Sequence, residues 1–212
     1  MTQYSKATLA SGLAAALGAY SLPTLADSAG DAARLVPALR PLDKSMRVAG
    51  LAYTVAGVSG DNLALHQGLE HCPSGCVLVA TVQGGASTGH WGGLMAVAAR
   101  QKGILGLVID GSVRDATEIA ALAFPVFAAG VHPRRCSKAR PGELNVAITC
   151  AGVMIHPGDI VIGDEHGIFV LPVESATAVL ERAGQLAQRE EDIVERLKHG
   201  ESLAALLGLE IS

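Results

Sequence analysis

Through the first two thirds of the chain, short apolar runs alternate with glycine-rich or polar turns and segments of helical periodicity. The apolar runs predict strands at residues 48–58, 76–82, 104–110 and 124–128. The periodic segments predict helices at residues 62–70, 91–101 and 114–121, the first of them capped by Asp61. This alternation of strand, loop and helix predicts an α/β fold that contains parallel strands.

Beyond residue 142 the pattern changes to short strands separated by turns. The strands are predicted at residues 144–149, 152–156, 159–162 and 167–171, with turns at 157–158 and 164–167. We expect these four strands to form an antiparallel meander. A long polar helix at 173–198 and a short helix at 202–207 are predicted to close the chain.

The N-terminal segment carries apolar residues at intervals of three or four, namely Leu9, Leu13, Leu17 and Tyr20. That interval favours an amphipathic helix at residues 5–20 over an export signal. Residues 21–40 are rich in small residues and prolines, and they predict a loop. Without a long linker or an internal repeat, the chain is predicted to form a single domain over residues 1–212. Its parts are the N-terminal helix at 5–20, a core at 45–172 and C-terminal helices at 173–208.

Composition narrows the classes of function. Half of the residues are apolar and 17% are charged, which is typical of a compact globular protein. A net charge of −4 argues against a general nucleic-acid binder, and 3% aromatic residues provide few surfaces for stacking bases. No apolar run reaches the roughly 18 residues that span a bilayer, so we expect no membrane partner and a cytoplasmic location. The four cysteines lack zinc-site spacing and are expected to be free thiols.

Two strand-to-helix connections carry candidate chemistry. At residues 84–95, glycines precede a helix whose free backbone N–H groups suit a carboxylate or phosphate. In the segment DGSVRD at 110–115, Arg114 and Asp115 stand where a strand ends, so they can hold an anion and a hard cation side by side. Glu118 shares the helical face of Asp115. Taken alone, the glycine-rich segment also suits an ordinary tight connection. The segment at 110–115 also suits a capped helix with a surface ion pair.

Together the motifs resemble one family. They are WGGLM at 91–95, GLVIDGSVRD at 106–115 and FPVF at 124–127, with DNLALH at 61–66, GV at 152–153, PGD at 157–159 and DEHG at 164–167. Over about three quarters of its length, the chain resembles the 4-hydroxy-4-methyl-2-oxoglutarate/4-carboxy-4-hydroxy-2-oxoadipate aldolases and the RraA-like regulators of ribonuclease E.

The resemblance implies a swivelling ββα fold that assembles as a homotrimer or a hexamer, with sites between subunits. It implies that Asp115 binds Mg²⁺ or Mn²⁺ and that Arg114 holds a 2-oxo acid and its developing enolate. The family's carboxylate-binding backbone amides match Gly92, Gly93, Leu94 and Met95, and its outer-shell glutamate from a neighbouring subunit matches Glu190. These roles agree with the chemistry, because a metal ion and a fixed cation both stabilise negative charge on the substrate oxygen.

One position departs from the family pattern. The aldolases usually carry an acidic residue 21 positions before the arginine, where this chain has Gly93. That residue orients a water as the base for the substrate hydroxyl, and a positioned base contributes about a hundred- to ten-thousand-fold in rate. We therefore expect weak aldol cleavage unless His90 or Glu118 substitutes for it. Decarboxylation of oxaloacetate needs no such base.

Three functions are consistent with the sequence. The preferred one is a metal-dependent carbon–carbon lyase that releases pyruvate from 2-oxo acids, by aldol cleavage or by decarboxylation of oxaloacetate. The second is a non-catalytic regulatory binding protein. The third is a family lyase with another substrate, whose loop at 131–141 uses Arg134 and Arg135 to select a second anionic group.

Overall fold

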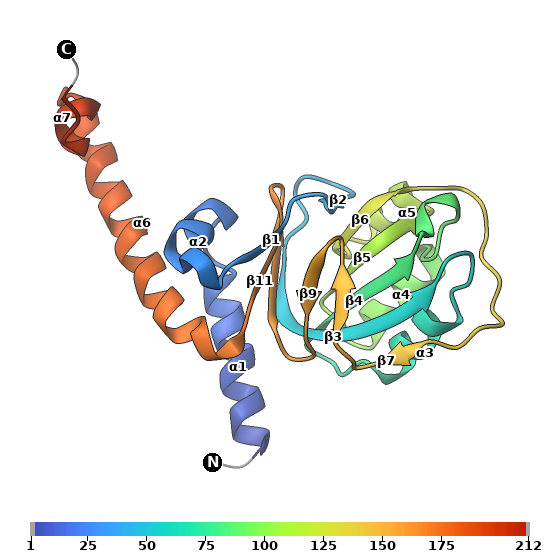
Figure 1. Ribbon diagram of the computed structural model, residues 1–212. Helices are drawn as coiled ribbons and strands as arrows, with labels where there is room; N and C mark the ends of the chain where they lie inside the picture. Colours follow the sequence, from blue (N-terminus) through green and yellow to red (C-terminus); the bar gives the residue numbers. More distant parts are fainter. Residues whose placement is uncertain (1–2, 211–212) are drawn as a thin grey trace.

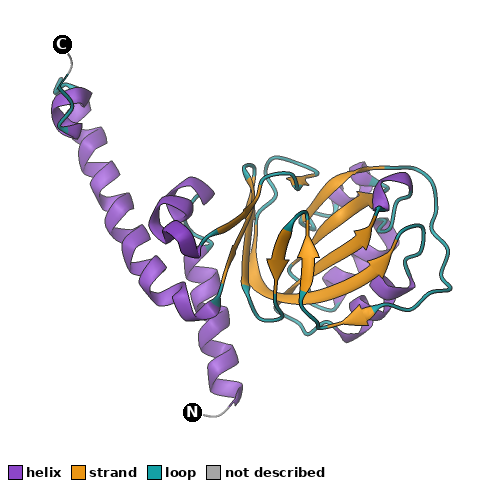
Figure 2. Cartoon of the chain, viewed as in Figure 1, coloured by secondary structure: helices purple, strands orange, loops and turns teal. Residues whose placement is uncertain are grey.

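The computed structural model describes residues 3–210, and its centre is a strongly curved sheet (Figures 1 and 2). The sheet has nine strands in the order β1-β11-β10-β3-β4-β5-β6-β2, with β7 paired to β3, and β8 and β9 form a separate hairpin. The strands are β1 (Arg34–Val36), β2 (Arg40–Pro41), β3 (Val48–Val58), β4 (Cys76–Gln83), β5 (Gly106–Val113), β6 (Val126–Val131), β7 (Glu143–Leu144), β8 (Ile148–Cys150), β9 (Val153–Ile155), β10 (Ile160–Asp164) and β11 (Gly167–Leu171).

The parallel half of the sheet confirms the α/β prediction. Strands β3, β4, β5 and β6 are parallel neighbours. The helices that connect them are α3 (Leu63–His71), α4 (Gly93–Gln101) and α5 (Ala116–Ala121). Strand β5 begins two residues later than predicted, because the N–H of Ile104 still donates to the carbonyl of Ala99 at the end of α4.

The two outermost strands bring the edges of the sheet towards each other. Strand β1 pairs with β11 and β2 pairs with β6, yet only residues 37–39 separate β1 from β2 in the chain. Across the inside of this curve, a Cβ added to Gly163 of β10 would lie 2.7 Å from the ring of Phe127 on β6. The glycine therefore permits the close approach that folds the sheet around its core.

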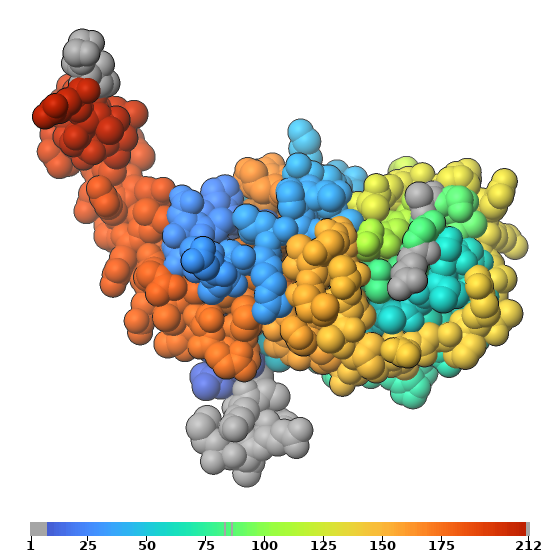
Figure 3. All heavy atoms as spheres, in the orientation of Figure 1, coloured from blue at the N-terminus to red at the C-terminus, as the bar shows by residue number. Residues whose placement is uncertain are grey.

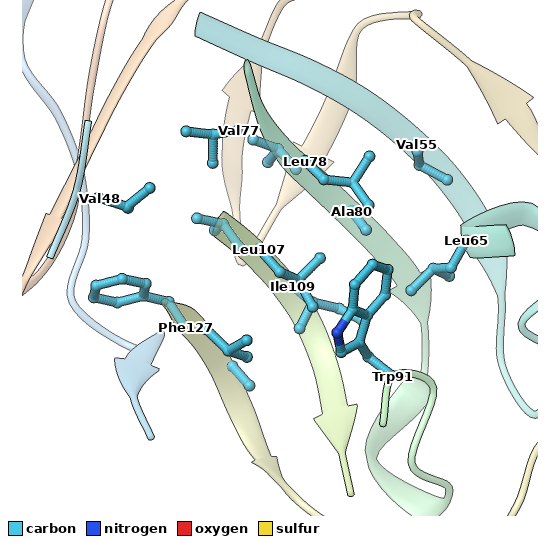
Figure 4. Packing of buried hydrophobic residues seen from close by; sticks show 14 of the residues in the cluster. Val48, Val55, Leu65, Val77, Leu78, Ala80, Trp91, Leu107, Ile109 and Phe127 are labelled. Atoms are coloured by element: carbon cyan, nitrogen blue, oxygen red, sulfur yellow. The ribbon is translucent and has the colours of Figure 1, made fainter. Parts of the chain in front are cut away.

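The main hydrophobic core is built around the parallel strands (Figure 4) and includes residues of helices α3, α4 and α5 as well as of the β8–β9 and β10–β11 hairpins. Trp91 is fully buried in it beside Leu65 and Ile109, and its ring stacks on Phe124 at 6.4 Å between centroids. Burial of a tryptophan contributes several kcal/mol. Trp91 thus fixes the segment that enters α4, on which the candidate site depends.

A second core covers the β10–β11 hairpin. Helices α1 (Gln3–Leu17), α2 (Leu22–Ala29) and α6 (Ala176–Lys198) pack there (Figure 1). The prediction of a loop at 21–40 is wrong: this segment forms α2, a 3₁₀ turn (Gly30–Ala32), β1 and β2. Ser21 caps α2 by accepting the N–H of Thr24, Pro23 stands in the first turn where it is tolerated, and Leu25 is buried.

The predicted meander is also wrong. Strands β8 and β9 pair only with each other, whereas β10 and β11 form a hairpin inserted in the main sheet between β3 and β1. The change of partner occurs at residues 158–159, where Gly158 N–H donates to Ala52 and the Asp159 carbonyl accepts from Ala52 N–H. These two hydrogen bonds begin the pairing of the chain with β3, which β10 then continues.

The C-terminal prediction is confirmed by a 3₁₀ turn (Val173–Ser175), α6 and α7 (Leu203–Leu207). Beyond Ala183, α6 extends away from the body of the molecule and carries α7 at its end (Figure 3). All four cysteines are free thiols, as expected. Within residues 3–210 no single helix is long and apolar enough to cross a membrane; residues 8–17 and 22–32 meet that test only together, with a 115° bend between them.

Candidate active site

A pocket of about 310 Å³ opens at the carboxyl ends of the parallel strands, where ligands gather in open α/β sheets. Residues that follow β3, β4, β5 and β6 all reach it. Its lining consists of Asn62, His66, Gly89, Trp91, Gly92, Leu94, Met95, Arg114, Asp115, Arg135, Cys136 and Lys138. The structure thus brings the two predicted connections, 84–95 and 110–115, into one site.

Arg114 and Asp115 form an ion pair at the mouth of the pocket. Arg114 Nε lies 3.1 Å from Asp115 Oδ1, and the two side chains are 30% and 27% exposed. Asp115 Oδ2 accepts the backbone N–H of Gly93 at 3.1 Å. The φ of Asp115 is 58°, a left-handed conformation that aspartate adopts more readily than most residues. Burial raises the pKa of Asp115, but the Gly93 N–H and the Arg114 guanidinium outweigh it, so the net pKa is lowered.

The N-terminus of α4 faces this ion pair. Its first intrahelical bond runs from Ala96 N–H to the Gly92 carbonyl, so the amides of residues 93–95 precede the hydrogen-bonded helix. Gly93 already donates to Asp115, which leaves the amides of Leu94 and Met95 for a ligand. A Cβ at Gly92 would lie 2.7 Å from Asp115 Oδ2, so a side chain at this position would displace the Asp115 carboxylate.

A carboxylate lies beside Gly93 although position 93 has no side chain. A Cβ added to Gly93 would lie 2.9 Å from Glu118 Oε2 and 3.8 Å from Asp115 Cβ. Glu118 reaches this place from α5, one turn after Asp115. It therefore occupies the volume that a side chain at position 93 would enter.

Neither candidate substitute for the missing acid, Glu118 or His90, is part of the pocket lining, and they differ in exposure: Glu118 is exposed beside Gly93. His90 is fully buried, and its Nε2 accepts the N–H of Gly60 at 3.1 Å. Burial lowers its pKa. A buried neutral imidazole that binds a backbone N–H is a structural link between two loops, so the geometry favours Glu118.

The carboxylates at the site suit an Mg²⁺ or Mn²⁺ ion that takes few ligands from the protein. Among residues 3–210, no group of three or more His, Cys, Asp or Glu side chains is placed to hold a metal ion. Zinc sites need three or four such ligands, whereas Mg²⁺ is bound by one or two carboxylates and keeps several waters. Asp115, with Glu118 close to it, meets the second requirement.

Six lining residues had no predicted role: Asn62, His66, Gly89, Trp91, Cys136 and Lys138. Asn62 follows β3 just as Arg114 follows β5, so the strand-end rule could have identified it. Asn62 Nδ2 donates to the His90 carbonyl at 2.9 Å, and its buried Oδ1 has no partner within residues 3–210. Lys138 arrives on a long loop whose path the local sequence does not reveal.

Asp61 fixes that loop. Its buried carboxylate accepts Ser137 Oγ at 2.5 Å and the backbone N–H groups of Ala139 and Arg140 at 2.8 and 3.2 Å, all through Oδ2. Its Oδ1 accepts the N–H of Leu63, the first residue of α3, at 2.9 Å; the N-cap position predicted for Asp61 belongs to Asn62, because the helix begins one residue later than expected. Burial raises the pKa of Asp61, yet these donors together hold it well below its usual range.

Glu190 does not approach the pocket of its own chain. It is exposed on the outer half of α6, at the opposite end of the molecule from α4 and α5 (Figure 1). The structure therefore does not bring Glu190 together with the other predicted site residues of its own chain.

Comparisons with known proteins agree with this architecture. A family model described as RraA-like, Aldolase/RraA, matches residues 22–170. An uncharacterized protein of Methanocaldococcus jannaschii is 36% identical over 90% of this chain and 91% of its own length. A Halalkalibacterium halodurans protein with the name "Putative 4-hydroxy-4-methyl-2-oxoglutarate aldolase" is 34% identical over 77% of this chain and 79% of its own. The solved RNA-processing inhibitor RraA from Thermus thermophilis superimposes with a TM-score of 0.66 at 29% identity, covering 72% of this chain and 93% of its own.

Proposed function

The chain belongs to the RraA-like family, whose model is described as Aldolase/RraA, and we propose that it is a carbon–carbon lyase that requires Mg²⁺ or Mn²⁺ and releases pyruvate from 2-oxo acids. One observation carries the proposal: Arg114 and Asp115 lie at the start of α4, where Gly93 donates to Asp115 and the next two amides are left for a ligand, at the mouth of a pocket. The proposed reactions are cleavage of substrates of the 4-hydroxy-4-methyl-2-oxoglutarate type and decarboxylation of oxaloacetate.

Asp115 would hold the divalent ion, with water as the remaining ligands. The lowered pKa of Asp115 keeps it ionised at neutral pH, as a ligand must be. A bound divalent ion supplies positive charge that stabilises the electron pair left on the substrate when the carbon–carbon bond breaks.

The substrate's own carboxylate fits the start of α4. The amides of Leu94 and Met95 and the positive end of the helix dipole favour an anion there. Arg114 binds Asp115 only through Nε, which leaves its Nη groups for the oxygen on which negative charge develops. Since Arg114 N–H also donates to the Trp91 carbonyl, the buried tryptophan helps to position the cation.

Glu118 is the proposed proton acceptor for aldol cleavage. It takes the place of an acidic side chain at position 93, and it would accept the proton of the substrate hydroxyl as the carbon–carbon bond breaks. Decarboxylation has no hydroxyl proton to remove. The two reactions should therefore differ in their dependence on Glu118.

We further propose that the pocket is completed by another copy of the chain, in a trimer or a hexamer. Leu94 lines the pocket and is 89% exposed, and Val97, one turn later on α4, is also exposed. Exposed apolar residues beside a site are a feature of interfaces. Such an assembly would cover them and could bring Glu190 of a neighbouring α6 to the site.

Pyruvate release by the purified protein tests the proposal. A lactate dehydrogenase couple would follow oxaloacetate and 4-carboxy-4-hydroxy-2-oxoadipate with Mg²⁺, with Mn²⁺ and with chelator, against protein-free controls. We expect turnover that needs the metal. Failure to turn over any 2-oxo acid, together with specific binding to a ribonuclease, would contradict the lyase and favour the regulatory role that the name of the Thermus relative describes.

A further inference from the structure

His90 is a fully buried imidazole that holds the turn between β3 and α3. Its Nε2 accepts the N–H of Gly60 at 3.1 Å, and its backbone carbonyl accepts Nδ2 of Asn62 at 2.9 Å. Its own backbone N–H donates to the Ser112 carbonyl of β5 at 2.8 Å. One residue therefore joins the turn after β3 to the end of β5, immediately before the segment that begins α4.

The turn that His90 holds in turn holds the loop after β6. The carbonyl of Gly60 accepts the backbone N–H of Ser137 at 2.9 Å and Ser137 Oγ at 3.1 Å. Both neighbours of Ser137 in the chain, Cys136 and Lys138, line the pocket. His90 does not line the pocket, so its effect on a ligand passes through Gly60 to this loop.

The hydrogen bond from Gly60 determines the form of the ring. Because Nε2 accepts an N–H, the ring proton of neutral His90 must lie on Nδ1. Nδ1 is buried and has no hydrogen-bond partner among the residues that the structure describes. An imidazolium would set a second N–H against that of Gly60 and place a charge in the interior. The contact with Gly60 therefore requires the neutral ring.

The groups around His90 leave its own titration as the event that breaks this contact in acid. Burial lowers the pKa of His90 below its ordinary value of 6.5, and the Asp61 carboxylate on the β3–α3 turn opposes this shift. Thr88, 3.4 Å from Nε2, and Ser112 of β5 carry no charge. On the loop after β6, Cys136 also contacts Thr88, and burial raises the pKa of its thiol, so it stays neutral in acid.

We propose that His90 is a positioning residue of the site: its neutral ring, accepting at Nε2, holds the loop after β6 against the pocket, and acid releases that loop. The inference rests on the proposed function only for the identity of the ligand beside the loop. The pKa of His90 is lower with the loop held than the ordinary value expected once the loop is released. The held form is therefore fully favoured above pH 6.5, and below it the ratio of held to released loop falls by up to about tenfold for each pH unit.

Hydrogen exchange followed by NMR tests this contact in the full chain without any substrate. In the wild type, the protection factors of the Gly60 and Ser137 amides should fall by up to about tenfold per pH unit below pH 6.5. His90→Gln is the matched variant, because an amide oxygen accepts the Gly60 N–H and does not titrate. It should show no such fall. The ¹⁵N shifts of the wild-type ring should show the proton on Nδ1 at neutral pH.

Kinetics of pyruvate release separate positioning from a purely structural role. In the wild type, KM should rise below pH 6.5 while kcat changes less, because Arg114 and Asp115 do not belong to the loop. His90→Gln should lose this rise in KM. His66, a pocket residue whose pKa burial also lowers, is the second imidazole to test, and His66→Gln should keep the loss of protection in acid.

The proposal is overturned if the wild-type protection factors do not depend on pH, if His90→Gln shows the same fall, or if the ring proton lies on Nε2. It is also overturned if His66→Gln, and not His90→Gln, removes the pH dependence. The predicted exchange without turnover of any 2-oxo acid would refute the proposed reaction and leave His90 as the residue that positions the loop.

Discussion

Two aspartates stand at corresponding places in this fold and have opposite surroundings. Asp61 follows β3 and precedes α3, and Asp115 follows β5 and precedes α5. Asp61 is 1% exposed and accepts four hydrogen bonds from the chain. Asp115 has a side chain that is 27% exposed and stands in a left-handed conformation, and within residues 3–210 its carboxylate accepts hydrogen bonds only from Gly93 and Arg114.

The difference shows how the same strand-end position can serve either the fold or a ligand. The oxygens of Asp61 are saturated by backbone and hydroxyl donors, so this carboxylate stabilises the loop at 137–140 and has no capacity left for a ligand. Asp115 keeps acceptor capacity facing a pocket, at the expense of a less favourable backbone conformation. Sequence motifs contain both residues, and only their hydrogen bonds separate the two roles.

Asp115→Asn should give the largest effect on turnover. Asparagine keeps the shape and tolerates the left-handed conformation, but it removes the charge that would hold a divalent ion. We expect pyruvate release to fall about a thousandfold for both substrates, with little change in thermal stability. Steady-state kinetics and thermal unfolding of the same preparation would measure both, and retained metal-dependent turnover would contradict the assignment.

Asp61→Asn should have the opposite effects: a large loss of stability and a small loss of turnover. Replacing a buried carboxylate that accepts four hydrogen bonds should lower the free energy of unfolding by about 2–3 kcal/mol. Because the pKa of Asp61 is lowered on folding, its ionised form stabilises the protein above pH 3.8, and this contribution is lost as the pH falls towards the folded-state pKa. Denaturant unfolding between pH 2 and 7 should show a shallower loss in acid for the variant than for the wild type.

Glu118→Gln should separate aldol cleavage from decarboxylation of oxaloacetate at the proposed site. We expect aldol cleavage to fall by about a hundredfold and decarboxylation of oxaloacetate to change much less, because only the former removes a hydroxyl proton. Adding Gly93→Asp to this variant should restore part of the cleavage, since the acid then comes from position 93 at a helix N-terminus that favours it. Equal losses in both reactions would mean that Glu118 binds the metal ion or stabilises the fold, and that it is not the proton acceptor.

The parallel half of the fold was predictable from sequence because its central strands, β4 and β5, are nearly continuous apolar runs buried on both faces. Helix α2 was not predictable from sequence. Its two buried leucines are separated by proline and threonine, and the partners that cover them, α6 and the β10–β11 hairpin, lie far along the chain. The predicted meander failed for a related reason. Strand β10 pairs with β3, more than a hundred residues earlier, and no local pattern encodes such a partner.

For the site, the strand-end rule led to Arg114 and Asp115 and would have led to Asn62. Helical spacing placed Glu118 on the face of Asp115, but only the structure puts its carboxylate against Gly93. Arg135 and Lys138 depend on the path of the loop after β6, which Asp61 determines from a distant part of the chain. Which of these side chains meet in one pocket is decided by tertiary structure and not by the local sequence.

The most direct test of the account is a crossed comparison of Asp115→Asn and Asp61→Asn for Mg²⁺-dependent pyruvate release from 4-hydroxy-4-methyl-2-oxoglutarate. Measurements should be made at a temperature where both variants are fully folded. We predict near-complete loss in Asp115→Asn and retention of most activity in Asp61→Asn. Equal activity in the two variants, or turnover in Asp115→Asn that a chelator does not change, would contradict the assignment of Asp115 as the carboxylate kept for the ligand.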